Sequence, residues 1–466
     1  MIENKAKFSK TELISIFGED AIVNSEADFY VRSVKIDSRE VKSGSLFVAL
    51  KGDKSDGHAF VAKAFASGAK AVMVTKEWYS KNYLNFPEKR FIIVDNTIQA
   101  LGKLALHHRL RFDIPIIAVA GSNGKTTSKE MISSVLAVKF NVLKTYANYN
   151  NQLGVPLMLL SLDSSYNVAV LEIGTNMPGE IALLTDMVLP NYGIITNIGK
   201  EHLEQLIDLD GVELEETTLF AKLYRKGTAF INSDDARLLK YTEILPNYTT
   251  FGTTNEAEVR GVITLNEVLN PTLDIYYNDR EVHCEMKCYG KHSSFNALGA
   301  AAIGFAFGLT DSQIAIGLSK YSPKESKGYG RMLVEKVGGI YLINDCYNAN
   351  PSSMAAAIES LDNIASTGQK IAVFGDMLEL GDSSIEEHVA VIKLAQNVAN
   401  TIILFGKEFE QAFYTMKNTE NIRYYSSKDQ LFIYLSKIVS GGDCVLVKGS
   451  RGTKMEEIIS LFKKYY

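Results

Sequence analysis

Short runs of apolar residues recur along the chain, and they alternate with longer segments in which apolar positions return every three or four residues. Continuous apolar runs are typical of strands buried on both faces of a sheet. The longer periodic segments are typical of helices that cover such a sheet. The alternation therefore predicts an α/β protein built on parallel sheets.

The pattern divides the chain into three blocks. With 466 residues, the chain exceeds what one hydrophobic core normally serves. We expect an α/β domain at residues 1–112, a central domain with a parallel sheet at residues 113–320, and a second doubly wound, Rossmann-like unit at residues 321–466.

The same pattern locates individual elements in each block. The expected strands are residues 31–36, 45–50 and 71–74, then 116–120, 168–174 and 193–198, then 340–343, 371–374, 401–405 and 444–447. The expected helices are residues 59–66, 128–136, 296–307, 314–318 and 354–361. In such sheets, ligands bind beyond the carboxyl ends of the strands.

Composition narrows the possible partners. The hydrophobic share of 46% and the charged share of 22% are ordinary for a soluble globular protein. A formal charge of −5 without a long basic run argues against nucleic acid as a partner, and no apolar run is long enough to cross a bilayer.

The first residues lack the apolar core of a signal peptide. Of four scattered cysteines, only Cys284 and Cys288 are close, without the second pair of a zinc site, so a reducing, cytoplasmic setting is expected.

The most informative stretch is residues 116–127. An apolar strand enters a turn bracketed by Gly121 and Gly124, and a helix follows. Glycines let the backbone approach an anion, and exposed N–H groups with the helix dipole favour negative charge. Lys125 can then reach the β- and γ-phosphates of a nucleotide, while the Thr126 hydroxyl can ligate Mg²⁺. Because Val119 stands where a full Walker A loop has glycine, the alternative is an ordinary turn with an unrelated lysine.

Further polar residues follow the carboxyl ends of predicted strands. Glu172 ends one strand, where a carboxylate can ligate Mg²⁺ or, alternatively, only cap a turn. His202 follows the next strand, although most single histidines are structural. In the third block, polar stretches after three strands predict a site at one sheet edge, at residues 345–354, 375–381 and 448–452.

With these motifs in view, the chain resembles the Mur ligases, and within them the branch that adds D-alanyl-D-alanine to UDP-N-acetylmuramoyl-tripeptide. The resemblance covers all three blocks. The motifs that carry it are Asp37-Ser38-Arg39, Asp56-Gly57-His58, Gly121-Ser122-Asn123-Gly124-Lys125-Thr126-Thr127, Asn148-Tyr149-Asn150-Asn151, Glu172-Ile173-Gly174, Thr196-Asn197-Ile198-Gly199, His202-Leu203-Glu204, Tyr347-Asn348-Ala349-Asn350-Pro351, Gly375-Asp376-Met377, Glu379-Leu380-Gly381 and Lys448-Gly449-Ser450-Arg451.

The resemblance implies an ATP- and Mg²⁺-dependent ligase of peptidoglycan synthesis, acting through an acyl phosphate, cytoplasmic and monomeric. Its substrates would be the UDP-tripeptide and D-alanyl-D-alanine. The implied catalytic residues are Lys125, Glu172, His202 and Glu216. Among the implied metal ligands, Thr126 binds the Mg²⁺ at the phosphates, and Glu172 and His202 bind a second Mg²⁺. The implied substrate-binding residues are Ser38, Arg39, Asp56, Gly57 and His58. The implied nucleotide-binding residues are Gly121, Ser122, Asn123, Gly124, Lys125, Thr126, Thr127, Asn296, Arg331, Asp345, Asn348 and Asn350.

Three positions depart from the family pattern. The family usually has a carbamylated lysine about fourteen residues after the metal-site histidine, and that position holds Glu216. A glutamate is anionic without carbamylation, although it could alternatively face solvent on its helix. The usual Phe-Gly-Ser is replaced by Leu206-Ile207-Asp208, and only Asn296 remains of two adenine-side asparagines. These departures leave open a paralogue with another amine and carboxylate, or a nucleotide-binding homologue without ligase activity.

Overall fold

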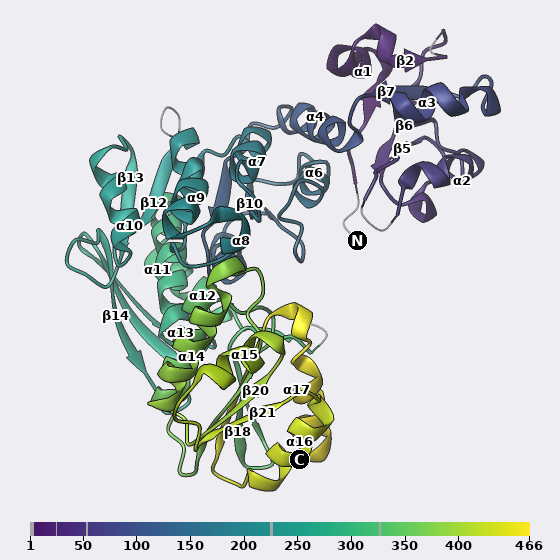
Figure 1. The fold of residues 1–466 in the computed structure, drawn as a ribbon. Coiled ribbons are helices and arrows are strands. Elements are labelled where there is room, and N and C mark those ends of the chain that lie inside the picture. Colours follow the sequence, from purple (N-terminus) through teal and green to yellow (C-terminus); the bar gives the residue numbers. More distant parts are fainter. Residues whose placement is uncertain (1–3, 25, 53–54, 224–226, 326–327) are drawn as a thin grey trace. The chain divides into compact units, whose positions relative to one another are not determined.

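The computed structural model describes residues 4–24, 26–52, 55–223, 227–325 and 328–466 (Figure 1). Their contacts divide the chain into two compact units. The first consists of Met1–Ala118, Phe140–Gly174 and Glu180–Asn191, and the second of Val119–Lys139, Thr175–Gly179 and Tyr192–Tyr466.

The first unit begins with a small sheet in the order β2-β7-β6-β5-β4. Neighbouring strands are parallel except β2, which is antiparallel to β7. The predicted strand 31–36 is instead two strands, because β3 pairs with β1 and β4 pairs with β5. The bounds are β1 (Phe8–Ser9), α1 (Lys10–Phe17), β2 (Ile22–Val23), β3 (Tyr30–Val31), β4 (Ser33–Lys35), β5 (Ser45–Val48), α2 (Val61–Ala66), β6 (Ala71–Thr75), α3 (Lys76–Asn82) and β7 (Phe91–Val94).

The rest of the first unit packs helices beside a parallel strand pair. Helix α4 contacts α6 and α7, and β10 pairs with β9. Strand β8 crosses the division, because it ends in the second unit. The bounds are α4 (Thr97–Arg109), β8 (Ile116–Ala120), β9 (Val142–Lys144), α6 (Gly154–Leu159), β10 (Val168–Glu172) and α7 (Glu180–Val188).

In the second unit, strands β11 to β14 pair in parallel, but β14, β15 and β16 are antiparallel. The parallel strands agree with the prediction of a parallel sheet in the central domain, whereas the antiparallel pairs were not predicted. Short turns close these hairpins. Strand β14 returns as β15 through residues 266–270, where Leu269 has a φ of 67°, and β15 returns as β16 through Asn278 and Asp279, where Asn278 has a φ of 52°. The bounds are β11 (Tyr192–Ile195), β12 (Thr228–Asn232), β13 (Tyr248–Gly252), β14 (Val259–Leu265), β15 (Pro271–Tyr277) and β16 (Arg280–Glu285).

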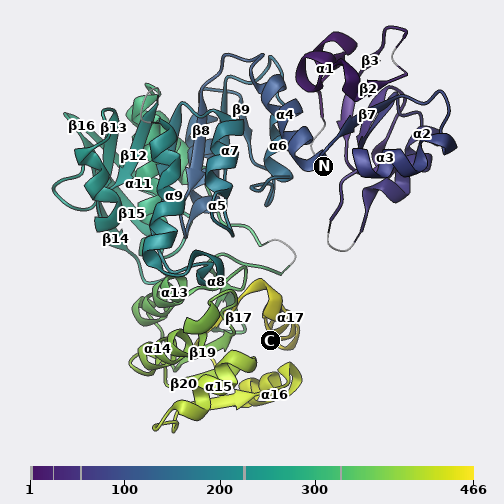
Figure 2. The same ribbon diagram turned by 45° about the horizontal axis from the view of Figure 1, so that its top comes forward.

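Helices cover these strands (Figure 2). Helix α11 packs on β12 to β15 and on α5, while α9 packs on β11 and β12. The predicted helix 296–307 begins earlier than expected, at Lys291. The bounds are α5 (Lys125–Leu136), α8 (Leu203–Leu206), α9 (Leu209–Leu223), α10 (Ala236–Leu239), α11 (Lys291–Ala306) and α12 (Asp311–Lys320).

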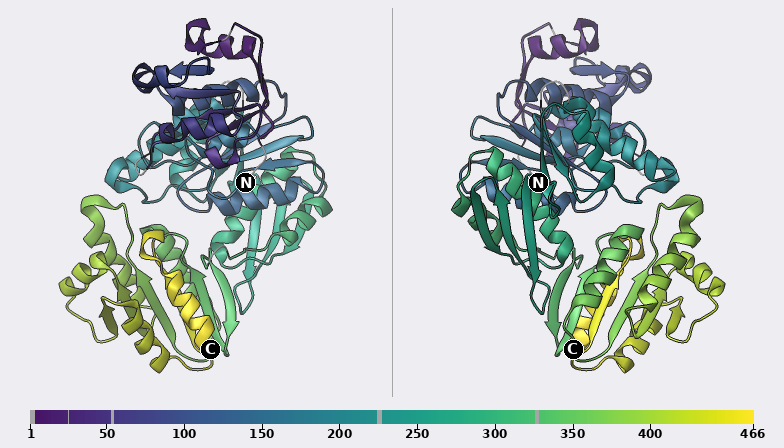
Figure 3. Two further views of the ribbon diagram at one scale, coloured as in Figure 1. Left: turned by 90° about the vertical axis from the view of Figure 1, so that its right-hand side faces the viewer. Right: turned by 90° about the vertical axis from the view of Figure 1, so that its left-hand side faces the viewer.

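The C-terminal part of the second unit is doubly wound, as predicted (Figures 1 and 3). Its sheet order is β17-β18-β22-β19-β20-β21, with only β17 antiparallel among the described strands. Helices α13, α14 and α15 contribute to one apolar cluster, and α16 and α17 to another. The bounds are β17 (Leu333–Val337), β18 (Ile340–Asp345), α13 (Pro351–Asn363), β19 (Lys370–Gly375), α14 (Ser384–Gln396), β20 (Thr401–Phe405), α15 (Lys407–Thr415), β21 (Ile422–Tyr425), α16 (Lys428–Ile438), β22 (Cys444–Lys448) and α17 (Glu456–Tyr465).

Across the described residues, no helix has the length and apolar character needed to span a membrane.

Candidate active site

The predicted phosphate loop connects β8 to α5, as the sequence indicated. Two of its positions require glycine. Gly121 has a φ of +110°, and a Cβ there would lie 2.4 Å from Thr196 Oγ1. Gly124 has a φ of +83°, and a Cβ there would lie 2.5 Å from Asn296 Oδ1. Side chains at either position would be strained and would push these neighbours away.

The segment after β11 holds this loop in shape. The backbone N–H of Ser122 donates to the Asn197 carbonyl at 2.9 Å, and the N–H of Asn123 donates to Asn197 Oδ1 at 3.1 Å. The Thr196 hydroxyl donates to the Asn123 carbonyl at 2.5 Å. The Thr-Asn-Ile-Gly motif is thus a scaffold for the phosphate loop.

The Lys125 ammonium lies against both backbone and carboxylate. It donates to the Gly121 carbonyl at 2.5 Å and to the Ser122 carbonyl at 3.3 Å, and it lies 3.4 Å from Glu201 Oε2. Glu201 is buried. Glu201 was not predicted as a site residue, although its position directly before His202 was a usable signal in the sequence.

Glu216 is fully buried beside the same loop. Its Oε2 accepts the Gly121 N–H at 2.7 Å. Burial raises the pKa of Glu216 to about 8, against the attraction of Lys125 and with the help of the adjacent Glu201 carboxyl. The alternative that Glu216 faces solvent on its helix is therefore wrong. Its expected charge also needs correction, because this pKa keeps most of the carboxyl protonated at neutral pH in the ligand-free protein.

The neighbouring acids on α9 are also buried but have other partners. Glu213 accepts from Arg237 at 2.7 Å and forms an ion pair with Lys240. Glu215 accepts the Gly179 N–H at 2.7 Å. Helix α9 therefore buries three carboxyl groups, and that of Glu216 contacts the phosphate loop by accepting the Gly121 N–H.

His202 lies at the start of α8 with a left-handed backbone, φ 50°. Its Nδ1 is 2.6 Å from Glu379 Oε2, and its Nε2 is 3.8 Å from Glu201 Oε2. The bond from His202 lowers the pKa of Glu379. The second unit thus brings together Lys125, Glu201, Glu216 and His202.

Glu172 belongs to the first unit, where it is the buried last residue of β10. Its Oε1 accepts from Asn150 Nδ2 at 2.9 Å, and its backbone N–H donates to Thr145 Oγ1 at 2.8 Å. This contact explains why the Asn148–Asn151 motif accompanies Glu172 in the sequence.

The nucleotide-binding candidates of the third block gather at the carboxyl ends of β18 and β22. Asp345 Oδ2 lies 2.5 Å from Lys448 Nζ, which also donates to the Asn348 carbonyl at 2.9 Å. Asn350 donates to Asn123 Oδ1 of the phosphate loop at 2.9 Å. The guanidinium of Arg331 lies over the ring of Tyr347, 3.6 Å from its centroid.

The remaining candidates of this group lie on α5 and α11. Thr126 and Thr127 are in the first turn of α5, directly after Lys125. Asn296 Oδ1 accepts the Ser128 hydroxyl at 3.0 Å, beside Gly124.

The first unit contains the predicted substrate-binding residues at the carboxyl ends of its strands. Arg39 forms a forked contact with Asp37, at 2.6 and 3.0 Å, and this contact lowers the pKa of Asp37 to about 2. The Arg39 side chain is 79% exposed, so the guanidinium remains accessible to an anionic ligand, while Ser38 is buried.

The Asp56-Gly57-His58 turn is tightly fixed. His58 Nδ1 lies 2.6 Å from Asp56, and its Nε2 accepts the Thr75 N–H at 3.1 Å. A Cβ on Gly57 would come within 2.7 Å of the Leu50 backbone. Both nitrogens of the buried His58 ring are thus occupied within the protein.

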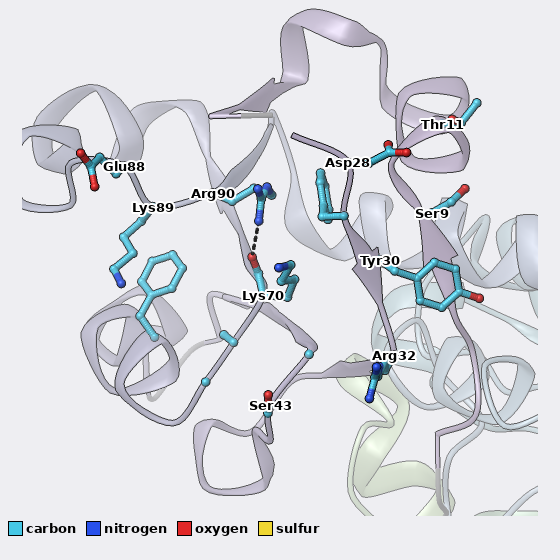
Figure 4. A pocket seen from close by; sticks show the side chains of 15 residues that line it. Ser9, Thr11, Asp28, Tyr30, Arg32, Ser43, Lys70, Glu88, Lys89 and Arg90 are labelled. Carbon is cyan, nitrogen blue, oxygen red and sulfur yellow. Dashed lines mark hydrogen bonds between the residues drawn. The ribbon is translucent and has the colours of Figure 1, made fainter. Parts of the chain in front are cut away.

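A cavity of about 780 Å³ lies elsewhere in the first unit (Figure 4). Arg32, Lys70 and Arg90 line it, and each directly precedes a strand, so the cavity lies where the strands begin. The Arg90 guanidinium lies 4.2 Å from the Phe29 ring centroid. None of the predicted substrate-binding residues lines this cavity.

Among the described residues, no group of three His, Cys, Asp or Glu side chains is placed to hold a metal ion. The four cysteines are buried and free. Glu201 and Glu216 each keep one buried carboxylate oxygen without a hydrogen-bond partner in the described structure.

A strand, a glycine turn and a lysine at a helix start, beside a doubly wound block, define a nucleotide-binding α/β protein. Comparison with known proteins makes this class specific. The Mur ligase family catalytic domain matches residues 30–109, the Mur ligase middle domain residues 119–304, and the Mur ligase glutamate ligase domain residues 330–451. The chain belongs to the Mur ligase family.

Similar proteins and similar solved structures match this chain over nearly its whole length. The UDP-N-acetylmuramoyl-tripeptide--D-alanyl-D-alanine ligase of Bacillus subtilis is 34% identical over 92% of both chains. The Escherichia coli protein of that name is 31% identical over 94% of this chain and 96% of its own. A crystal structure of MurF from Acinetobacter baumannii has a TM-score of 0.89, with 27% identity over 99% of this chain and 100% of that one. MurF from Thermotoga maritima, in complex with ADP, has a TM-score of 0.82, with 26% identity over 92% and 97%.

Proposed function

We propose that this protein joins D-alanyl-D-alanine to UDP-N-acetylmuramoyl-tripeptide using ATP, in peptidoglycan precursor synthesis. The observation that carries the proposal is the phosphate loop with Lys125 beside the Glu201 and Glu216 carboxyls. Ligases of that name match the chain over at least 92% of its length.

The chemistry requires activation of a carboxylate, which is a poor electrophile because its leaving group would be oxide. Transfer of the γ-phosphoryl of ATP gives an acyl phosphate. The dipeptide amine attacks its carbonyl carbon, an oxyanion forms, and inorganic phosphate leaves as the amide is completed. Lys125 is the phosphate-loop cation that would offset repulsion between ATP and the substrate carboxylate.

Each block would have a separate task. Residues 1–112 would hold the UDP part, through Ser38, the accessible Arg39 and the turn that His58 fixes. Residues 113–320 would bind the phosphates. Residues 321–466 would cover the nucleotide and exclude water from the acyl phosphate. The residues proposed to contact the nucleotide are Gly121, Ser122, Asn123, Gly124, Lys125, Thr126, Thr127, Asn296, Arg331, Asp345, Asn348 and Asn350.

Magnesium fits the donor set around the phosphate loop. Mg²⁺ usually takes one or two carboxylates together with substrate phosphates and water. Glu201 and Glu216 offer buried carboxylate oxygens without hydrogen-bond partners among the described residues. Thr126 would hold the ion at the phosphates, and Glu172 and His202 would serve a second Mg²⁺, with Glu216 in place of the family's carbamate. When bound, the cation would neutralise developing phosphate charge.

A paralogue that accepts a different amine is the second candidate. The observation that favours it is Ile207, which replaces the glycine of the family loop after the metal-site histidine. Ile207 has a φ of 73° and is 82% exposed, a conformation that β-branched residues rarely adopt. Such strain is common at functional sites, so this apolar side chain could alter amine selection.

Mass spectrometry of the product tests the proposal. Purified protein would receive ATP, Mg²⁺, UDP-N-acetylmuramoyl-tripeptide and either D-alanyl-D-alanine or a panel of other amino acids and dipeptides. We expect the UDP-pentapeptide as the product. We also propose that the protein acts as a monomer in the cytoplasm, so the reaction should need no membrane fraction. Product with another amine but not with D-alanyl-D-alanine would favour the paralogue. ATP binding without any amide product would favour a homologue that does not ligate.

A further inference from the structure

Glu379, in the Glu379-Leu380-Gly381 motif, contacts the segment that contains His202. Its carboxylate Oε2 lies 2.6 Å from Nδ1 of His202, and its backbone carbonyl accepts the Glu204 N–H at 3.2 Å. Glu379 therefore contacts the histidine segment through both side chain and backbone. Nothing in the proposed reaction uses Glu379 so far.

We propose that Glu379 is a positioning residue that orients the His202 ring toward the cation site at the phosphate loop. This inference rests on the proposed function, because it assumes that His202 serves that site. A carboxylate that accepts from Nδ1–H fixes the tautomer and leaves the Nε2 lone pair available to a metal ion. In this structure, Nε2 faces Glu201, at 3.8 Å from Oε2.

The surroundings hold both partners in this arrangement. His202 and Glu379 both have left-handed backbones, with φ values of 50° and 66°. Residues other than glycine keep a positive φ only where the surrounding structure imposes it. A Cβ on Gly381 would come 3.1 Å from Glu204 Cα, so the two segments pack closely.

Apolar packing links the same two segments. Leu203 and Leu206 of α8 belong to one buried cluster with Met377 and Leu380. The position of His202 therefore depends on how the C-terminal block is seated. Contact between residues 113–320 and residues 321–466 would complete the cation site. Metal binding would therefore depend on the C-terminal block being in place.

A second ion pair at this junction supplies a matched control. Lys200, two residues before His202, pairs with Glu387 of α14. Glu387→Gln weakens the junction without touching the histidine. Glu379→Gln keeps an acceptor for Nδ1–H but removes its charge, and Glu379→Ala removes both.

The test measures Mn²⁺ affinity by electron paramagnetic resonance, on the full chain with saturating ADP. Carboxylates that orient a metal-bound histidine typically contribute 10–100-fold to affinity. We expect Glu379→Ala to weaken Mn²⁺ binding by about that factor, Glu379→Gln to weaken it less, and Glu387→Gln to leave it within roughly twofold of wild type. Equal affinities in Glu379→Ala and Glu387→Gln would overturn the inference, and so would full affinity in Glu379→Gln if the alanine variant fails to fold.

Product analysis of the wild-type protein separates this inference from the proposed function. If the UDP-pentapeptide forms while Glu379→Ala binds Mn²⁺ normally, the ligase assignment stands and the role of Glu379 is wrong. If Mn²⁺ binding falls as expected but no amide forms with any amine, Glu379 positions His202 in a protein with another activity.

Discussion

Glu216→Gln should make the ligand-free protein more stable at neutral pH, although it should lower ligation. Glu216 is fully buried, and its pKa is raised from 4.5 to about 8. Between these values the folded protein keeps a proton that the unfolded chain has released. Each pH unit in that window therefore lowers the wild-type free energy of unfolding by about 1.36 kcal/mol.

Glutamine resembles the protonated carboxyl, because its carbonyl oxygen can accept the Gly121 N–H and its amide can donate to the adjacent Glu201 carboxylate. Glutamine does not titrate, so the variant avoids the loss of unfolding free energy that the wild-type protein suffers above pH 4.5. At pH 7 the variant should gain on the order of 3 kcal/mol, and the gain should vanish near pH 4.5. Activity should fall, because the variant lacks the anion proposed to face magnesium.

The assay is urea unfolding followed by circular dichroism from pH 4.5 to 8, with hydrogen exchange of α9 as the local readout. The single tryptophan, Trp78, lies in the first unit, so its fluorescence would not report on α9. Glu213→Gln is the control, and we expect it to change the free energy of unfolding at pH 7 in the opposite direction. Despite burial, the bonds from Lys240 and Arg237 lower the pKa of Glu213, so its loss should destabilise at pH 7 and matter less in acid. A Glu216→Gln variant that is no more stable than wild type at pH 7, or whose difference is independent of pH, would refute the reasoning.

The other predictions concern the reaction. Lys125→Ala should abolish ligation with the fold intact by circular dichroism; near-normal turnover would remove the phosphate-loop assignment. Asp345→Ala should raise the KM for ATP more than that for the UDP substrate, and equal changes would exclude a nucleotide role. Arg39→Ala should weaken binding of the UDP substrate but not of ATP, as measured by calorimetry. Weaker ATP binding would contradict the proposed division of tasks between the blocks. If Glu216 serves in place of the family's carbamylated lysine, as proposed, turnover should not change with bicarbonate, and stimulation by bicarbonate would show that a carbamate forms elsewhere.

The sequence could predict features that neighbouring residues determine. The phosphate loop is one continuous stretch, and its glycines must meet Thr196 and Asn296 whatever surrounds them. The doubly wound C-terminal block was likewise evident from its apolar strands. The antiparallel strands β14 to β16 were missed because they alternate apolar with polar residues and lack the continuous apolar runs of the other strands, although the turn at Asn278 was a local signal.

The contacts around Glu216 could not be predicted, because they join residues far apart in the chain. Gly121 and Glu216 are separated by 95 positions, and Lys125 and Glu201 by 76. Spacing identified Glu216 as a candidate, but only the fold shows that it is buried and that its carboxyl meets Glu201. The separation of His202 from Glu379 hid that contact for the same reason.

Isotope transfer tests the central claim, ligation through an acyl phosphate, most directly. The substrate would be UDP-N-acetylmuramoyl-tripeptide with ¹⁸O in the reacting carboxylate, supplied with ATP, Mg²⁺ and D-alanyl-D-alanine. If the γ-phosphoryl joins that carboxylate, each inorganic phosphate released must carry one oxygen from it. We expect ¹⁸O-labelled phosphate to form in step with the amide product. Unlabelled phosphate, or phosphate release without amide, would contradict it.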